Sequence, residues 1–136
     1  MAHGYGRMLY FKHASIDRAI REVLALEALD TAAAAQGIAF AYVMLNHRDL
    51  HRILEIGQPV AQLALREAFG NGVIYALAFW EWAYPGFLDC FTPAPARQTE
   101  WLSMAYQLAE ESRLLGHLPI FGIPVAKAAC PDPGGC

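Results

Sequence analysis

The fold of this chain depends most on one apolar stretch, Ile38-Ala-Phe-Ala-Tyr-Val-Met-Leu45. It is apolar on every side, so hydrophobic periodicity alone does not separate a buried helix from a buried strand. Its two interior alanines favour a helix, whereas Phe40, Tyr42 and Val43 favour a strand. We expect a helix here, with a buried strand as the alternative.

A second apolar stretch, Val73 to Tyr84, has the same ambiguity and ends at Pro85-Gly86. The preceding Gly70-Asn71-Gly72 predicts a turn, and an Asn-Gly pair is also typical of a hairpin. The competing fold is therefore α+β, with three short strands separated by helices. Those strands would be Met8 to Phe11, Ile38 to Leu45 and Val73 to Phe79.

The remaining segments have clearer helical spacing. Ser15 is a good N-cap, and apolar residues then recur at helical spacing from about 15 to 29, with helix-forming alanines continuing towards Gln36. A short helix ending at Gly57 and another opening at Pro59 are expected next. The last helix ends at Gly116. Its apolar stripe is Trp101, Met104, Ala105, Leu108, Ser112 and Leu115.

Together these segments predict an all-α fold, an irregular bundle of about five helices. The segment from His117 to Val125 is apolar but interrupted by prolines and a glycine, so we expect it to wrap the core in an extended form. We expect one helical domain over residues 1–125 and a flexible tail over 126–136. The tail contains Cys130 and Cys136, which could alternatively close a redox or metal loop.

Composition limits the classes of function. The chain has 136 residues, 56% hydrophobic and 17% charged, which suits one well-filled core and excludes an intrinsically disordered chain. Its formal charge of −3 gives no broad positive field for nucleic acid. We find no apolar run of membrane-spanning length, no secretory signal and an odd number of cysteines, and we expect a cytoplasmic protein.

One pattern could bind a metal. In His47-Arg-Asp-Leu-His51-Arg-Ile-Leu-Glu55, two imidazoles and a carboxylate recur every four residues, which places them along one side of a helix. Glu27 adds a further carboxylate, because the helical spacing puts it on an apolar stripe where a charge needs a compensating partner. Glu27, His47, His51 and Glu55 are therefore the candidate ligands for iron or zinc.

The aromatic segment from Phe79 to Phe91 suggests a binding surface. Consecutive side chains on a helix point about 100° apart, so its aromatic side chains cannot all face one core. Trp and Tyr anchor many protein interfaces, and Glu81 and Asp89 are expected to form a charged rim. The predicted partner-binding residues are Phe79, Trp80, Trp82, Tyr84 and Phe87.

Several enzyme signatures are missing from the sequence. It has no nucleophile elbow, no P-loop and no dinucleotide fingerprint. We therefore expect a small, non-enzymatic module that binds another protein or a second copy of itself, as an inhibitor, an immunity-type protein or an adaptor. No cofactor is expected in that case. The alternative is a metal-dependent helical-bundle enzyme that uses the His/Glu cluster.

Overall fold

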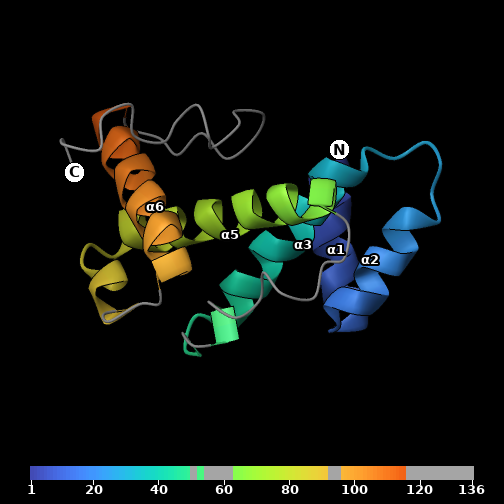
Figure 1. Cartoon of the computed structure of the whole chain (residues 1–136), viewed down its shortest axis with the longest axis horizontal. Coiled ribbons are helices and arrows are strands. Elements are labelled where there is room, and N and C mark those ends of the chain that lie inside the picture. Colours follow the sequence, from blue (N-terminus) through green and yellow to red (C-terminus); the bar gives the residue numbers. More distant parts are fainter. Residues whose placement is uncertain (50–51, 54–62, 92–95, 116–136) are drawn as a thin grey trace. The chain divides into compact units, whose positions relative to one another are not determined.

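A computed structural model describes residues 1–49, 52–53, 63–91 and 96–115, and this part of the chain is all-α (Figure 1). Helices account for 84% of it, and it contains no strand. The all-α prediction is confirmed and the α+β alternative is wrong, because all three proposed strands are helical. The elements are α1 (Ala2–His13), α2 (Ile16–Leu24), α3 (Thr31–Asn46), α5 (Leu63–Ala83), the 3-10 helix η1 (Phe87–Phe91) and α6 (Ala96–Leu115).

The stretch 38–45 lies within α3. Asp30 caps the helix by accepting a hydrogen bond from the backbone N–H of Ala33 at 3.0 Å, and a run of alanines then propagates it. Residues 34–35 and 37–43 are buried, so this helix has almost no polar face in the part that packs in the core. Burial on all sides explains the absence of a helical period in its sequence.

Helix α1 was not expected from the sequence, which contains two glycines and two histidines in twelve residues. Close packing explains it. A Cβ added to Gly6 would collide with the backbone of Ala34, and one added to Gly37 would collide with the backbone carbonyl of His3. The glycines therefore let α1 and α3 approach at backbone distance.

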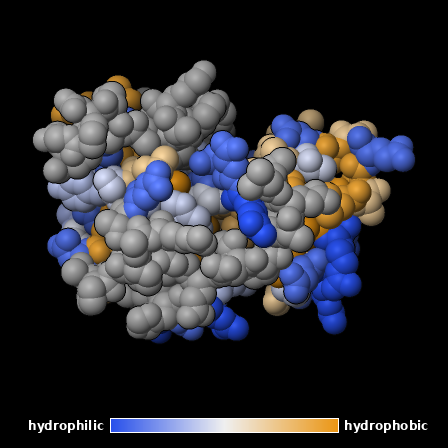
Figure 2. Space-filling view, viewed as in Figure 1, coloured by the Kyte–Doolittle hydropathy of each residue, from blue (hydrophilic) through white to orange (hydrophobic). Residues whose placement is uncertain are grey.

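Helix α2 begins as expected but ends early. The Ser15 side chain accepts a hydrogen bond from the backbone N–H of Arg18 at 3.4 Å, which confirms the predicted cap. The helix ends at Leu24 rather than near residue 29, because residues 25–29 turn towards the separate cap of α3 at Asp30. Leu24 and Leu26 are exposed there, and Figure 2 shows hydrophobic surface beside strongly hydrophilic side chains on this side of the molecule.

The predicted turn at Gly70-Asn71-Gly72 is wrong, because these residues lie inside α5. A Cβ on Gly72 would meet the backbone carbonyl of Gln36 and the Cβ of Ala39. This glycine is needed for close contact with α3, and the contact overrides the local preference for a turn.

The chain divides into two compact units, unit 1 over Met1–Val73 and unit 2 from Ile74 onwards. Helix α5 contributes residues to both units. The expectation of one domain over 1–125 stays a prediction. The proposed tail and the extended segment from His117 to Val125 lie outside the described residues. Within the described part, no helix is long and apolar enough to cross a membrane.

In unit 2, α6 largely matches its predicted stripe. Ala105, Leu108 and Ser112 are buried, and the Ser112 hydroxyl donates to the backbone carbonyl of Leu108 at 2.6 Å. Leu115 is exposed, contrary to expectation, because it lies in the last turn of the helix.

Candidate functional site

The described part of the predicted metal cluster gives no ligand geometry. His47 follows the last turn of α3, and its Nδ1 lies 3.2 Å from the backbone carbonyl of Met44. Glu27 lies in the exposed turn after α2, so its placement on an apolar stripe was wrong and it needs no compensating partner. His51 and Glu55 lie outside the described residues. Among the residues that the structure describes, no group of three or more His, Cys, Asp or Glu side chains is arranged to hold a metal.

The five predicted partner-binding residues form one continuous series of ring contacts at the end of α5 and in η1. Trp80 stacks against Tyr84, with ring centroids 5.7 Å apart, and against Phe87 at 5.8 Å. Phe79 contacts Trp80 at 6.0 Å and Trp82 at 6.2 Å. We call these five residues the aromatic cluster.

Exposure within the aromatic cluster is uneven. Tyr84 is 63% exposed, whereas Phe79, Trp80, Trp82 and Phe87 are half-buried. The two tryptophans therefore contribute to packing and surface at once, as expected from their angular separation on a helix. Tyr84 is the most accessible ring of the cluster, and its stacking on Trp80 limits the conformations it can take.

Glu81 has a structural role that sequence reasoning missed. It was expected on a charged rim, but it is only 3% exposed. Its carboxylate accepts hydrogen bonds from the backbone N–H groups of Gly86 at 3.0 Å and Leu88 at 2.9 Å. These bonds join α5 to the start of η1, so Glu81 fixes the turn that carries Tyr84 and Phe87. Asp89, the other expected rim residue, is exposed.

Arg113 of α6 completes this polar link. Its Nη2 donates to the backbone carbonyl of Glu81 at 2.5 Å and lies 3.7 Å from the Glu81 carboxylate. Its Nη1 also pairs with Glu110. The buried carboxylate of Glu81 is thus compensated by backbone donors and a guanidinium, which is the condition for keeping a charge in an apolar setting.

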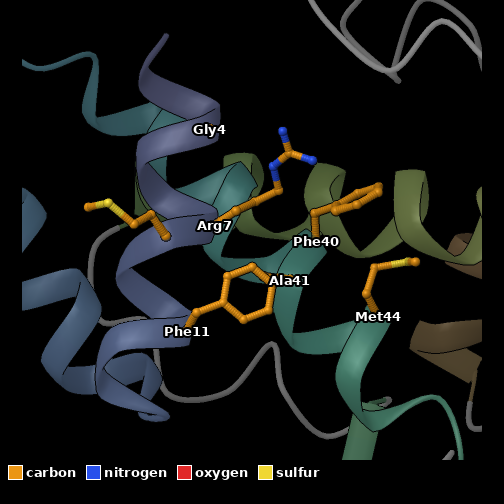
Figure 3. A pocket seen from close by; sticks show the side chains of 7 residues that line it. Gly4, Arg7, Phe11, Phe40, Ala41 and Met44 are labelled. Atoms are coloured by element: carbon orange, nitrogen blue, oxygen red, sulfur yellow. The ribbon is translucent and has the colours of Figure 1, made fainter.

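A groove that the sequence did not indicate lies between α1 and α3 in unit 1 (Figure 3). Its volume is about 430 Å³. The Arg7 guanidinium lies over the Phe40 ring, 5.8 Å from the centroid. The lining residues are Gly4, Arg7, Met8, Phe11, Phe40, Ala41 and Met44.

His3 of α1 packs against Phe40 of α3, which is one of the residues that line the groove. His3 is buried, and its ring meets the edge of Phe40 with centroids 5.8 Å apart. Burial, followed by repulsion from the Arg7 guanidinium, lowers the pKa of His3 from 6.5 to about 4. The imidazole is therefore neutral at physiological pH, which suits its place in the core.

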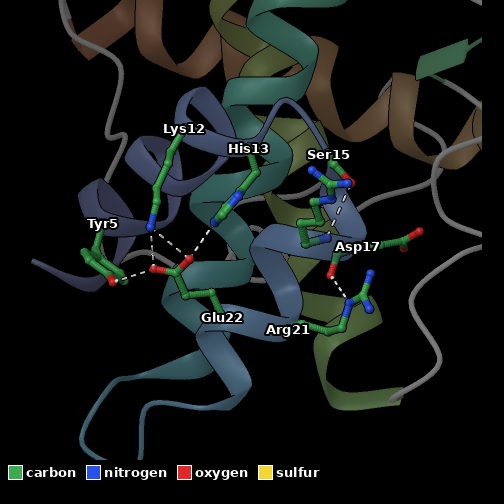
Figure 4. A network of polar contacts seen from close by, with 8 residues as sticks. Tyr5, Lys12, His13, Ser15, Asp17, Arg21 and Glu22 are labelled. Atoms are coloured by element: carbon green, nitrogen blue, oxygen red, sulfur yellow. Dashed lines mark hydrogen bonds and ion pairs between the residues drawn. The ribbon is translucent and has the colours of Figure 1, made fainter.

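A polar cluster on α1 and α2 converges on Glu22 (Figure 4). Lys12 Nζ lies 3.2 Å from both carboxylate oxygens, His13 Nε2 lies 2.5 Å from Oε2, and the Tyr5 hydroxyl donates to Oε1 at 3.5 Å. The bonds from His13 and Lys12 lower the pKa of Glu22. This arrangement fastens α2 to α1. We assign it a structural role, because every group in it has a partner within the cluster.

No protein-family model, curated protein or solved structure matches this chain.

Proposed function

We propose that this protein is a small protein-binding module, an inhibitor, immunity-type protein or adaptor, that binds its partner through the aromatic cluster. The partner is another protein or a second copy of the chain, and we place the interaction in the cytoplasm. The observation that carries the proposal is the exposed Tyr84 ring, stacked on Trp80 at the edge of the cluster.

Two properties of the cluster support this function. Aromatic side chains supply large contact area at low cost in conformational entropy, and they are enriched among the residues that dominate binding energy. The turn that presents Tyr84 and Phe87 is held by hydrogen bonds to the carboxylate of the buried Glu81. A surface ordered before binding loses less freedom when the partner arrives.

Site-specific photo-crosslinking tests the proposal. A photoreactive phenylalanine analogue replaces Tyr84 in the full chain, expressed in its native cells, and the crosslinked product is identified by mass spectrometry. Tyr106 on α6 provides the matched control, because it is a tyrosine of comparable exposure, 49%, outside the cluster. We expect a single dominant adduct from position 84 and none from position 106.

The captured protein, or the chain itself if the adduct is a dimer, is then purified for binding measurements. Tyr84→Ala is expected to weaken binding by about 30-fold, equivalent to about 2 kcal/mol for an interface anchor. Tyr106→Ala should leave the affinity unchanged. Equal crosslinking at both positions, or an affinity insensitive to Tyr84, would contradict the proposal.

A further inference from the structure

An exposed carboxylate lies beside the aromatic cluster. Asp89 of η1 is exposed, and its Oδ2 lies 3.8 Å from the position that a Cβ on Gly86 would occupy. Gly86 has a φ of +94°, which favours glycine, so this residue places no side chain over the carboxylate. Among the residues that the structure describes, the Asp89 side chain has no hydrogen-bond or ion-pair partner. Its charge is therefore accessible to a binding partner.

Backbone hydrogen bonds hold Asp89 close to Tyr84. The N–H of Phe87 donates to the carbonyl of Tyr84 at 3.0 Å, and the N–H of Asp89 donates to the carbonyl of Gly86 at 3.2 Å. The carboxylate of Glu81 fixes the same segment from inside the unit. The Tyr84 ring and the Asp89 carboxylate are thus presented by one short, ordered turn.

Tyr84 offers a ring face to a partner. Its ring stacks on Trp80, with the two planes 29° apart, and the residue is 63% exposed. Because Trp80 covers one face, the exposed area lies on the other face and the ring edge. An aromatic face attracts cations, and a carboxylate pairs with them. A guanidinium satisfies both groups, since its plane stacks on the ring while its N–H groups donate to the carboxylate.

The distribution of charge along the chain favours a basic partner. Unit 2 contains six Asp and Glu residues and three Lys and Arg residues, whereas unit 1 contains seven of each class. The whole net charge of −3 therefore belongs to unit 2. Arg113 in this unit is already paired with Glu81 and Glu110. A basic segment is complementary to unit 2, whereas a second copy of this unit would bring like charges together.

We propose that the aromatic cluster binds a basic segment of a different protein, and that an arginine of this segment stacks on Tyr84 and pairs with Asp89. This inference rests on the proposed function, because it names the chemistry of the partner that the cluster binds. Arginine suits the site better than lysine, because an ammonium group has no plane to stack on the ring.

A random peptide library displayed on phage tests the partner's chemistry. The library is selected on the full-length protein and counter-selected against Tyr84→Ala, so that the retained peptides depend on the cluster. We expect arginine to be enriched in these peptides relative to the unselected library, and Asp and Glu to be depleted.

A double-mutant cycle tests the contact with Asp89. One selected peptide is synthesised with arginine or with citrulline, which keeps the shape of the side chain but not its charge, and binding is measured by fluorescence anisotropy. Citrulline and Asp89→Asn should each weaken binding by about tenfold. Together they should cost little more than either change alone. Glu27→Gln removes an equal charge from an exposed residue of unit 1 and should leave the affinity unchanged.

The outcomes separate this inference from the proposed function. Peptides that depend on Tyr84 but lack arginine would overturn the inference and leave the proposed function standing. Additive effects of citrulline and Asp89→Asn would also overturn it, as would self-association of the chain that Tyr84→Ala abolishes. If no selected peptide depends on Tyr84, both the inference and the proposed function fail. The citrulline peptide is measured on the unaltered protein, so this comparison does not depend on the folding of any variant.

Discussion

At the scale of single residues, His3 makes stability depend on pH. Its pKa is lowered from 6.5 to about 4 in the folded protein, mainly by burial. Between these values the unfolded chain takes up a proton that the folded protein does not, so acidification favours unfolding. Stability should be fully present above pH 6.5 and should fall as the pH approaches 4, by up to about 3 kcal/mol.

Urea unfolding at a series of pH values checks this, with His3→Gln as the variant. The variant should be less stable near neutral pH, because Gln fits the site less well, but its stability should change little from pH 6.5 to pH 4. If the stability of His3→Gln falls as steeply between pH 6.5 and pH 4 as that of the wild type, another group causes the pH dependence.

Glu22 should also make the stability depend on pH, in a more acidic range than His3. Its pKa is lowered below 4.5, first by the bond from His13 and then by the bond from Lys12. A carboxylate with a lowered pKa stabilises the fold above its unfolded value, and this contribution disappears as the pH falls through the folded value. Glu22→Gln should therefore flatten the pH dependence below pH 4.5 and leave the contribution of His3 in place.

Gly6 and Gly4 offer a matched pair on one helix. A Cβ at Gly6 collides with the backbone of Ala34, whereas a Cβ at Gly4 comes no nearer than 4.0 Å to the end of the Arg7 side chain. Gly6→Ala should therefore lower the free energy of unfolding by about 2 kcal/mol or more. Gly4→Ala should raise it by about 0.5 kcal/mol through helix propensity. Thermal and urea unfolding measure whether each variant loses or gains stability. A gain in stability from Gly6→Ala would exclude the close approach of α1 and α3.

At the scale of elements, the same glycines explain which helices could be predicted. The sequence predicted α2 and α6 from caps and apolar stripes, both of which are local signals. It failed at α1 and at the middle of α5, where Gly6 and Gly72 serve contacts with α3. Such contacts join residues far apart in the chain, so their need for glycine cannot be distinguished locally from a turn signal.

Glu81 determines how α5 passes into η1. Glu81→Ala leaves the backbone N–H groups of Gly86 and Leu88 without their acceptor and removes one of the two carboxylates that lie near Arg113, the other being that of Glu110. We expect a loss of about 2 to 4 kcal/mol in the free energy of unfolding, measured by urea denaturation. Glu81→Gln retains an acceptor oxygen and should lose less. Equal stability of the wild type and Glu81→Ala would contradict the role assigned to this carboxylate.

At the scale of the whole molecule, the sequence predicted the aromatic cluster but missed the groove. Five aromatic residues close together in sequence are a local signal, and the structure does join them. The groove combines α1 with α3, whose lining residues are separated by about thirty positions. Because α1 itself was not expected, no pairing of its face with α3 could be inferred.

The division of the chain at Val73 makes a prediction about cooperativity. Each unit is compact by itself, and compact regions of a chain can open as separate cooperative units when one is destabilised. Gly6→Ala acts in unit 1, so amide hydrogen exchange measured by mass spectrometry should accelerate in α1 and α3. Amides of α6 should retain their protection. Glu81→Ala should show the converse, with faster exchange in η1 and α6 and little change in α1. If either variant instead lowers protection by the same free energy in both units, the chain unfolds as one cooperative domain, and the boundary at Val73 has no thermodynamic meaning.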